Sequence, residues 1–478
     1  MICLMPNCCF LSETSRMLEI YRALRERGGS AAGAPGGAGI KVVTHGGPYE
    51  SLLRTAGVPY DVLGPGVSTR RYQEFLRSVP GIGPADQSMW SDEELRSYAA
   101  AEAEYFARHQ VRAAVTGWTL TALLSTRLAG IPLVTEHAGS FLPPVFERGL
   151  LPAPSMPVGL PGERFLPRRA RRWIQNAAPA RIDAYTAGLN RVAAELGVEP
   201  VPSFAALLLG DLTLVTDVPE VLGLPRAEVD GWTPRDPRRY RPGTRLRYTG
   251  PLYAHLDLPV PDQVRAFLAG RRPVIYVAIT SSTPDLVRQV VRSLQPLDAR
   301  ILVAATTHDL ADLGNSQVMV AGLLPSHLVM GDADLAVIAG GQGSVQTALA
   351  AGLPFVGIPL QPEQDANLTF AQNQGAARLI PQKAAGTTAM TAAARDLLAD
   401  AAAVDSARRI KQIFAAVDGP GAAAQAVLEI AAADAGHHQP GVPAAVPAAT
   451  EDEASVTSYR AEPARSARAP RPPGRPGR

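Results

Sequence analysis

The chain has 478 residues, of which 46% are hydrophobic, and a formal net charge of +2 at pH 7. That length provides for two domains with full cores, and the near-neutral charge argues against wholesale nucleic-acid binding. The apolar runs are too short to span a bilayer, and the N-terminus lacks the basic region and cleavage site of a signal peptide.

Short apolar runs alternate with helix-like segments in two series. The first series predicts strands at 2–5, 41–44, 113–115, 133–135 and 212–215, and the second at 274–278, 301–305, 318–321, 335–338 and 355–358. Such alternation is typical of parallel sheets with helices on both faces. The sequence therefore predicts an α/β fold with two Rossmann-like domains.

A stretch rich in proline and arginine, residues 232–262, predicts the connection between the domains. We expect an N-terminal domain at residues 1–240 and a C-terminal domain at 241–432. The remainder, residues 433–478, is rich in proline, alanine and arginine, which cannot build a core, so we expect a disordered tail.

All three cysteines, Cys3, Cys8 and Cys9, lie in or just after the first predicted strand. Adjacent cysteines make poor disulfide partners, and no further metal ligands stand near them. We expect small buried thiols in a reducing compartment, and therefore a cytoplasmic protein.

Residues 335–367 carry the clearest functional signal. A predicted strand ends in a glycine-rich turn, a helix-like stretch and a second strand follow, and a polar cluster closes the segment. Backbone N–H groups at such a turn point outward, and the helix dipole favours negative charge, so the turn predicts a phosphate site.

This segment resembles the donor-binding signature of GT-B glycosyltransferases that use nucleotide sugars, the UDP-glucuronosyltransferase-like superfamily. The family pattern runs roughly HGG-x-G-T/S, a helix, G-x-P, a strand, P, three residues, then D/E-Q and N. Ten residues match in order: Gly340, Gly341, Gly343, Ser344, Gly352, Pro354, Pro359, Glu363, Gln364 and Asn367. The family's first His, which contacts the diphosphate, is Ala339 here.

The resemblance implies two Rossmann-like domains that face each other across a cleft. It places the donor diphosphate over Gly341, Gly343 and Ser344, and the sugar hydroxyls on Glu363 and Gln364. Two further loops of the family approach the donor. The first corresponds here to Ser281 and Ser282, although helix capping by Ser282 or Thr283 is an equal alternative. The second corresponds to Leu324, which the resemblance places beside the nucleotide base.

The family's catalytic His lies in the loop after the first strand, and an Asp on a later strand orients it. Counting from the following helix places Glu13 at the His position, and the same spacing places Thr116 at the Asp position. Glu13 is therefore a candidate general base, because a carboxylate needs no partner to fix a tautomer. The alternative is that Glu13, with Ser12 or Thr14, caps the helix.

Two histidines offer other candidate bases. His45 and His137 both follow predicted strands, and ligands of α/β sheets gather at the carboxyl ends of strands. We rank His137 second after Glu13. Residues 141–173 are proline-rich and apolar and then basic, which suggests an acceptor lid, a surface for a lipid-linked acceptor, or a packed irregular connection.

The resulting hypothesis is a metal-independent, inverting glycosyltransferase that moves a hexose-type sugar from a UDP- or dTDP-linked donor to a small-molecule or lipid acceptor. It needs no cofactor besides this co-substrate, and peripheral membrane association is compatible with it. The composition suggests a bacterial source. The alternatives are a non-catalytic homologue that assists another transferase, motivated by the departures at positions 13, 116, 323 and 339, and a sugar-nucleotide epimerase.

Overall fold

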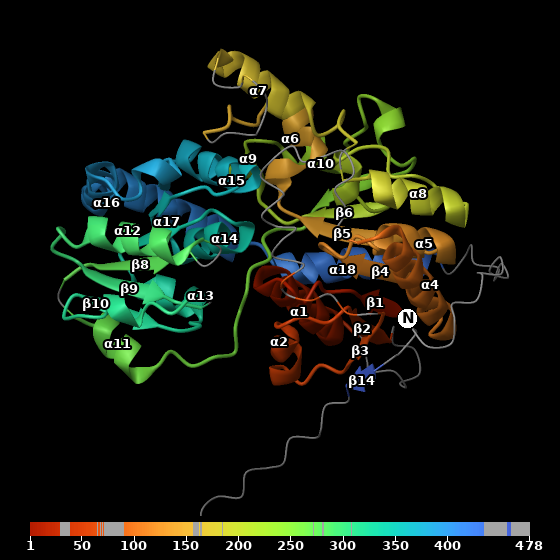
Figure 1. Cartoon of the computed structure of the whole chain (residues 1–478), viewed down its shortest axis with the longest axis horizontal. Coiled ribbons are helices and arrows are strands. Elements are labelled where there is room, and N and C mark those ends of the chain that lie inside the picture. The colour runs from red at the N-terminus through yellow and green to blue at the C-terminus, as the bar shows by residue number, and fades with distance from the viewer. Residues whose placement is uncertain are drawn as a thin grey trace, which may run out of the picture.

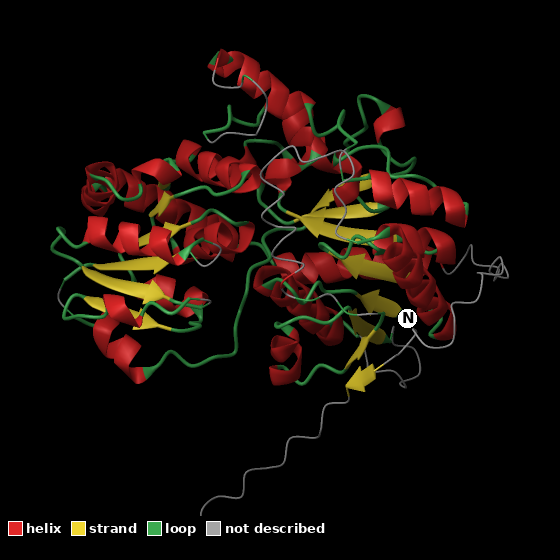
Figure 2. Cartoon of the chain, viewed as in Figure 1, coloured by secondary structure: helices red, strands yellow, loops and turns green. Residues whose placement is uncertain are grey.

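The chain folds into two α/β domains that lie side by side, and the helix α7 protrudes beyond them (Figure 1). This computed structural model describes residues 1–28, 39–64, 66, 68, 70, 90–155, 162, 165–183, 185–270, 272–279, 282–306, 308–434 and 457–459. Each domain has a central sheet between layers of helices (Figure 2). The predicted α/β architecture with two parallel sheets is confirmed.

The N-terminal sheet has the strand order β14-β3-β2-β1-β4-β5-β6-β7. Its parallel strands are β1 (Ile2–Leu4), β2 (Ile40–Thr44), β3 (Tyr60–Val62), β4 (Ala113–Thr116), β5 (Leu133–His137), β6 (Leu212–Val215) and β7 (Arg245–Tyr248). Its helices are α1 (Leu11–Glu26), α2 (Glu50–Thr55), α4 (Asp92–Arg108), α5 (Ala122–Ala129), α6 (Pro143–Glu147), α7 (Arg168–Ala177), α8 (Ala187–Leu196), α9 (Pro219–Leu222) and α10 (Arg226–Asp230).

The C-terminal sheet is parallel throughout and has the order β10-β9-β8-β11-β12-β13. Its strands are β8 (Val274–Ala278), β9 (Arg300–Ala304), β10 (Val318–Ala321), β11 (Leu335–Ile338), β12 (Phe355–Gly357) and β13 (Ala377–Leu379). Its helices are α11 (Asp262–Leu268), α12 (Pro284–Leu294), α13 (Ser326–Val329), α14 (Gln342–Ala351), α15 (Pro362–Asn373), α16 (Thr388–Ala399) and α17 (Ala401–Ala415).

The N-terminal sheet extends past residue 240, where the sequence predicted the domain boundary. Strand β7 at Arg245–Tyr248 pairs with β6, inside the stretch expected to be a linker. The chain then crosses to the second sheet between β7 and β8. It returns at the end, because the last helix, α18 (Gly419–Asp434), packs against α1 of the N-terminal domain.

Most of the predicted disordered tail lies outside the described residues. Its first residues, Ala433 and Asp434, still belong to α18, and Thr457–Tyr459 form β14, which pairs antiparallel with β3. The helical stretch Ala401–Ala433 is long and apolar enough, by length and composition alone, to cross a membrane. Here it is divided into α17 and α18, which pack against α14 and α1 respectively, as core helices do.

The three cysteines are buried and unbridged, as expected. Cys3 lies within β1, and Cys8 and Cys9 lie in the turn that leads to α1. Burial raises the pKa of all three thiols, that of Cys9 to about 11. They are therefore protonated, inert packing groups at neutral pH.

Candidate active site

The glycine turn lies between β11 and α14, at the carboxyl edge of the C-terminal sheet. Gly340 adopts a positive φ of 93°, and a Cβ atom there would lie 2.5 Å from Cγ of Leu368. Gly341 is the N-cap of α14 and supplies no side-chain cap, so the first N–H groups of the helix lack acceptors from the cap or the helix. The space beside Gly341 is open to 4 Å. The turn therefore leaves backbone N–H groups available to an anion.

The same turn faces the N-terminal domain. The nearest atom to a Cβ built on Gly343 is Cβ of Ser12, at 3.7 Å. Gln342 donates a hydrogen bond to the hydroxyl of Thr216, just after β6. One helix turn later, Gln346 donates to the carbonyl of Thr216 and to Oδ1 of Asp217. The start of α14 thus lies at the cleft between the domains.

The polar cluster on α15 also reaches across this cleft. Asn367 accepts a hydrogen bond from the hydroxyl of Ser140, and its amide donates to the carbonyl of Gly340 (3.1 Å) and to Oε1 of Glu363 (3.0 Å). Asp365 accepts two 2.6 Å hydrogen bonds from Ser155. Gln364 instead stays within its domain and accepts the N–H of Leu360 at 2.8 Å.

A buried charge cluster lies beside the donor motif. Nε of Arg16, on α1, is 2.7 Å from Oε1 of Glu136, at the end of β5. Arg16 also interacts electrostatically with Glu13 and with Glu363 of the other domain. Burial raises the pKa of all three carboxyl groups, that of Glu13 to about 8. Of these three groups, Glu13 can keep a proton near neutral pH.

Glu13 does not cap α1, so that alternative is wrong. Its Oε1 accepts the N–H groups of Trp118 (2.6 Å), Gly117 (3.2 Å) and Asn7 (3.2 Å). Oε2 has no partner among the described residues. Thr116, at the family's Asp position, donates to the carbonyl of Met5 and does not contact Glu13. Backbone N–H groups, rather than a side chain, thus orient this carboxylate.

The two candidate histidines differ in their surroundings. Burial lowers the pKa of His137 to about 3, and its Nε2 has no partner in the described chain, so the ring is neutral at working pH. Nε2 of His45 lies 2.7 Å from Oε1 of Glu102, and the His45 ring stacks on Tyr98 with centroids 4.2 Å apart. His45 therefore belongs to a carboxylate–histidine pair inside the N-terminal domain.

The other two predicted donor loops lie at the same sheet edge. Ser281 falls outside the described residues. Ser282 donates its hydroxyl to the carbonyl of Ile279 (2.7 Å), and Thr283 caps α12 by accepting the N–H of Leu286. Leu324 is buried in the core, and its neighbour Leu323 is 38% exposed. Any contact with a nucleotide base would thus come from Leu323 or from the backbone of Leu324.

Three residues of the site escaped the sequence interpretation. Arg16 lies one helical turn after Glu13, so the sequence spacing predicts that both lie on the same face of α1. The spacing does not predict the partners of Arg16, because they come from distant parts of the chain. Asp217 lies two residues after the end of β6, where no motif marks the sequence. Burial raises its pKa to about 6. Ser140 lies in a short 3₁₀ turn, Gly139–Phe141, that carries no motif.

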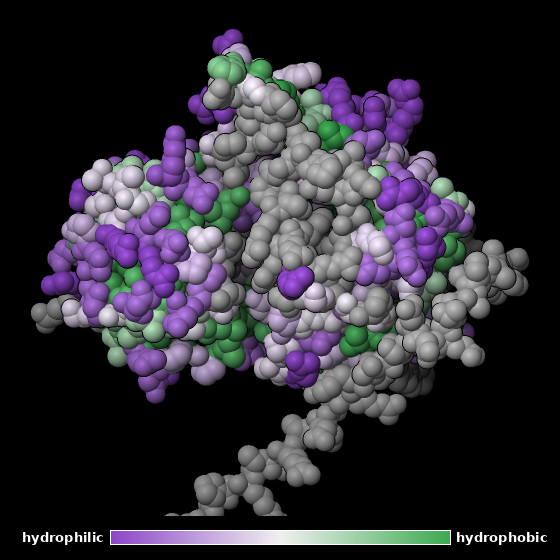
Figure 3. All heavy atoms as spheres, in the orientation of Figure 1, coloured by the Kyte–Doolittle hydropathy of each residue, from purple (hydrophilic) through white to green (hydrophobic). Residues whose placement is uncertain are grey.

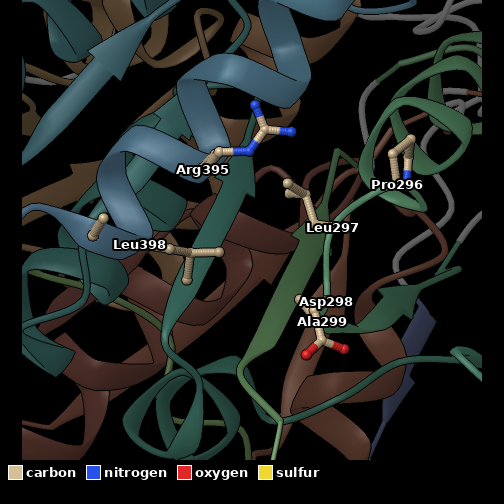
Figure 4. A pocket seen from close by; sticks show the side chains of 7 residues that line it. Pro296, Leu297, Asp298, Ala299, Arg395 and Leu398 are labelled. Atoms are coloured by element: carbon tan, nitrogen blue, oxygen red, sulfur yellow. The ribbon is translucent and has the colours of Figure 1, made fainter.

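A separate surface pocket of about 260 Å³ lies between α16 and the turn before β9 (Figure 4). Leu297, Asp298, Arg395 and Leu398 are among its lining residues. It opens at the amino ends of the strands, whereas the donor motif lies at their carboxyl ends, where ligands of α/β sheets bind. We therefore do not assign it to the active site. The described residues contain no group of three or more His, Cys, Asp or Glu arranged to hold a metal ion.

Comparisons with known proteins point to one class of enzyme. Residues 303–418 match the glycosyltransferase family 28 C-terminal domain. A PGL/p-HBAD biosynthesis glycosyltransferase of Mycobacterium tuberculosis (strain ATCC 25177 / H37Ra) is 26% identical over 324 residues, which are 67% of this chain and 71% of that protein.

Solved structures agree on the fold. The spinosyn forosaminyltransferase SpnP superposes with a TM-score of 0.60 at 12% identity, covering 90% of this chain and 99% of its own. The glycosyltransferase VinC, solved in complex with dTDP, superposes with a TM-score of 0.59 at 15% identity, covering 91% and 100%. Together with the family match and the curated relative, the two facing parallel sheets identify the chain as a glycosyltransferase with the GT-B fold.

Proposed function

We propose that this enzyme transfers a hexose-type sugar from a nucleoside diphosphate sugar to a hydroxyl of a small-molecule or lipid acceptor, with inversion and without a metal ion. The observation that carries the proposal is the uncapped N-terminus of α14, which opens to the cleft beside the Arg16 cluster. The transferase relatives favour this function over the auxiliary partner and the epimerase.

The donor diphosphate would bind at the start of α14. The N–H groups of Gly341, Gly343 and Ser344 and the helix dipole supply positive potential without a cation. The hydroxyl of Ser344 now donates to the carbonyl of Gly341 (2.9 Å) and can turn to a phosphate oxygen. Because these donors are fixed before the reaction, they stabilise the charge that develops on the leaving diphosphate.

The sugar would lie between α14 and the charge cluster. Glu363 and Gln364 accept hydrogen bonds from its hydroxyls, and Asn367 holds Glu363 in place at 3.0 Å. Ser282, which follows the neighbouring strand β8, would approach the phosphates, and the resemblance assigns the same role to Ser281. The base of a UDP- or dTDP-linked donor would lie near Leu324.

In the transfer step Glu13 acts as the general base. The acceptor hydroxyl loses its proton to the Glu13 carboxylate as its oxygen bonds to the anomeric carbon. The bond from that carbon to the diphosphate oxygen breaks, and its electron pair leaves with the nucleoside diphosphate. Attack opposite the leaving group inverts the anomeric configuration. A base with a pKa of about 8 matches this task near neutral pH.

The test is isothermal titration with UDP, dTDP and the corresponding purine diphosphates. Gly343→Asp places a carboxylate among the phosphate donors, and we expect it to weaken binding by roughly 100-fold or more. Gly343→Ala is the control: its Cβ meets nothing closer than 3.7 Å, so we expect a much smaller loss. If no nucleotide binds, or if Gly343→Asp binds like wild type, the proposal fails.

A further inference from the structure

The helix α7 and the turn before it stand out from the rest of the surface. None of the residues of α7 is buried, and the helix protrudes from the N-terminal domain in Figure 1. Phe165 is 75% exposed and Trp173 is 67% exposed, the highest values among the large hydrophobic residues that the structure describes. Figure 3 shows hydrophilic and apolar residues side by side on this protrusion.

The exposed face of α7 is strongly basic. Arg168, Arg169, Arg172 and Trp173 are all exposed, and the helical spacing places them on one side. In the part of the chain that the structure describes, no carboxylate forms an ion pair with these arginines; Arg172 donates to the neutral carbonyl of Gly149 at 2.7 Å. The positive charge of this face is therefore uncompensated.

The C-terminal part of α7 anchors the helix. Asn176 accepts the N–H of Leu151 and donates to its carbonyl, both at 3.0 Å, and α7 packs on α6. An anchored helix presents its exposed face with little loss of entropy on binding. Water-exposed aromatic side chains on a rigid, basic face need a partner that is apolar and negatively charged at once.

We propose that α7, together with Phe165, docks this enzyme on an anionic phospholipid membrane. Aromatic side chains insert at the level of the lipid headgroups, and arginines beside them attract anionic lipids. An acidic protein surface would match the charge but would leave the exposed side chains of Phe165 and Trp173 without an apolar layer to enter. The membrane satisfies both requirements.

The docked helix would also bring the cleft close to the lipid. The hydroxyl of Ser140 donates a hydrogen bond to Asn367 across the cleft, and Ser140 lies in the turn directly before α6. Helix α6 packs against α7. An acceptor held in the bilayer would thus approach the cleft along this short segment. Membrane docking itself rests on the surface of α7 and on Phe165, and does not depend on the proposed donor or base.

The experiment is co-sedimentation of the full chain with phosphatidylcholine vesicles and with vesicles in which about a third of the lipid is phosphatidylglycerol. We expect binding to the anionic vesicles, at least roughly tenfold weaker binding to the neutral ones, and release at high salt. The triple variant R168E/R169E/R172E should lose at least roughly tenfold in binding. The matched control R238E/R265E/R408E changes the net charge equally at exposed arginines elsewhere and should bind like wild type.

Trp173 gives a direct readout of insertion. Anionic vesicles should shift its emission to the blue, and Trp173→Ala should abolish the shift, because Trp90 is buried and Trp118 and Trp232 are partly buried. Absence of vesicle binding by the wild type, equal loss in both triple variants, or an unchanged emission would each overturn the proposal. Turnover of a water-soluble acceptor by R168E/R169E/R172E should equal that of wild type, which separates docking from the donor site.

Discussion

Arg16 determines the charge balance of the cleft. Its guanidinium is buried and faces the carboxyl groups of Glu13, Glu136 and Glu363. One positive charge cannot compensate three negative charges in a poorly solvated site, so some of these carboxyl groups must hold protons. Burial raises the pKa of all three groups, and the neighbouring Glu136 carboxylate raises that of Glu13 further.

Removing the cation should leave the carboxylates unpaired. We expect Arg16→Gln to lower the free energy of unfolding by about 3–5 kcal/mol at pH 7, measured by urea denaturation. The loss should shrink as the pH falls, because carboxyl groups with raised pKa values then take up protons. Arg408→Gln is the control, because that side chain is 70% exposed, and should cost less than about 0.5 kcal/mol. Equal stability of the two variants at pH 7 would contradict this account.

The activity should depend on the ionised form of Glu13. Because burial raises its pKa to about 8, we expect kcat/KM to rise with pH and to level off above about 8. Glu13→Gln should reduce kcat by roughly 10²–10⁴-fold and abolish the rise of kcat/KM with pH. His137→Gln and His45→Gln, assayed in parallel, test the other candidates. An unaffected Glu13→Gln enzyme, with turnover lost in His45→Gln, would transfer the role to the His45–Glu102 pair.

The raised pKa of Glu13 also affects stability. The folded state holds this proton more tightly than the unfolded state, where the pKa is 4.5. The stabilisation that this proton gives the folded state is therefore fully present below about pH 4.5 and is lost as the pH rises through about 8. At pH 8.5 Glu13→Gln should be more stable than wild type by on the order of 1–3 kcal/mol, and at pH 4 the two should have similar melting temperatures.

At the scale of elements, the first two glycines of the turn from β11 to α14 differ in backbone conformation and in the space around them. Gly340 combines a φ of 93° with a Cβ position 2.5 Å from Leu368, whereas Gly341 has a φ of −60° and open space. The first glycine shapes the turn, and the second leaves room in front of the helix.

This difference predicts unequal effects of the same substitution. Gly340→Ala should destabilise the protein by about 2–4 kcal/mol, because it adds backbone strain and a clash with Leu368. Gly341→Ala should cost less than about 1 kcal/mol and should act mainly on nucleotide binding. Thermal denaturation of the two variants, with and without nucleotide, separates the roles; similar melting temperatures without nucleotide would refute the assignment.

The sequence predicted the apolar strands and missed those that carry more polar residues. All ten predicted strands are present within a residue or two, because apolar residues such as Val, Ile and Leu dominate their runs. It missed β3, β7, β13 and β14, whose sequences YDV, RLRY, ARL and TSY carry polar residues. These strands lie at or near sheet edges, where one side can face water and the apolar signal fades.

The candidate site was predictable where it is local in sequence. The glycine turn and the polar cluster on α15 lie within one βαβ unit, so their spacing is informative. The environment of Glu13 was not predictable, because its hydrogen-bond donors Gly117 and Trp118 come from a distant loop. The link from Asn367 to Ser140 likewise joins residues from different domains.

At the scale of the whole molecule, the last helix completes the first domain. Four residues of α18, Ala423, Ala424, Ala426 and Val427, are fully buried in the cluster that includes Ile20 and Leu24 of α1 and Val115 of β4. The two domains are therefore joined twice, through the crossing after β7 and through the crossing between α17 and α18.

Truncation should expose this dependence. A chain that ends after Asp418 lacks α18, and we expect the N-terminal domain to lose several kcal/mol, because a face of its core becomes exposed. A chain that ends after Asp434 keeps that face covered and should retain cooperative unfolding. Circular dichroism melts and limited proteolysis compare the two chains. A shorter chain as stable as the longer one would show that α18 is dispensable.

The return of α18 has a consequence for synthesis in the cell. The ribosome makes β1 to β7 first, but the residues that close the core of their sheet emerge only after the entire second sheet. At about 5–20 residues per second, the first domain waits many seconds with an apolar face of α1 uncovered. The first domain therefore completes its core only after the second sheet has been made, which predicts that chaperones for incomplete domains bind the nascent chain.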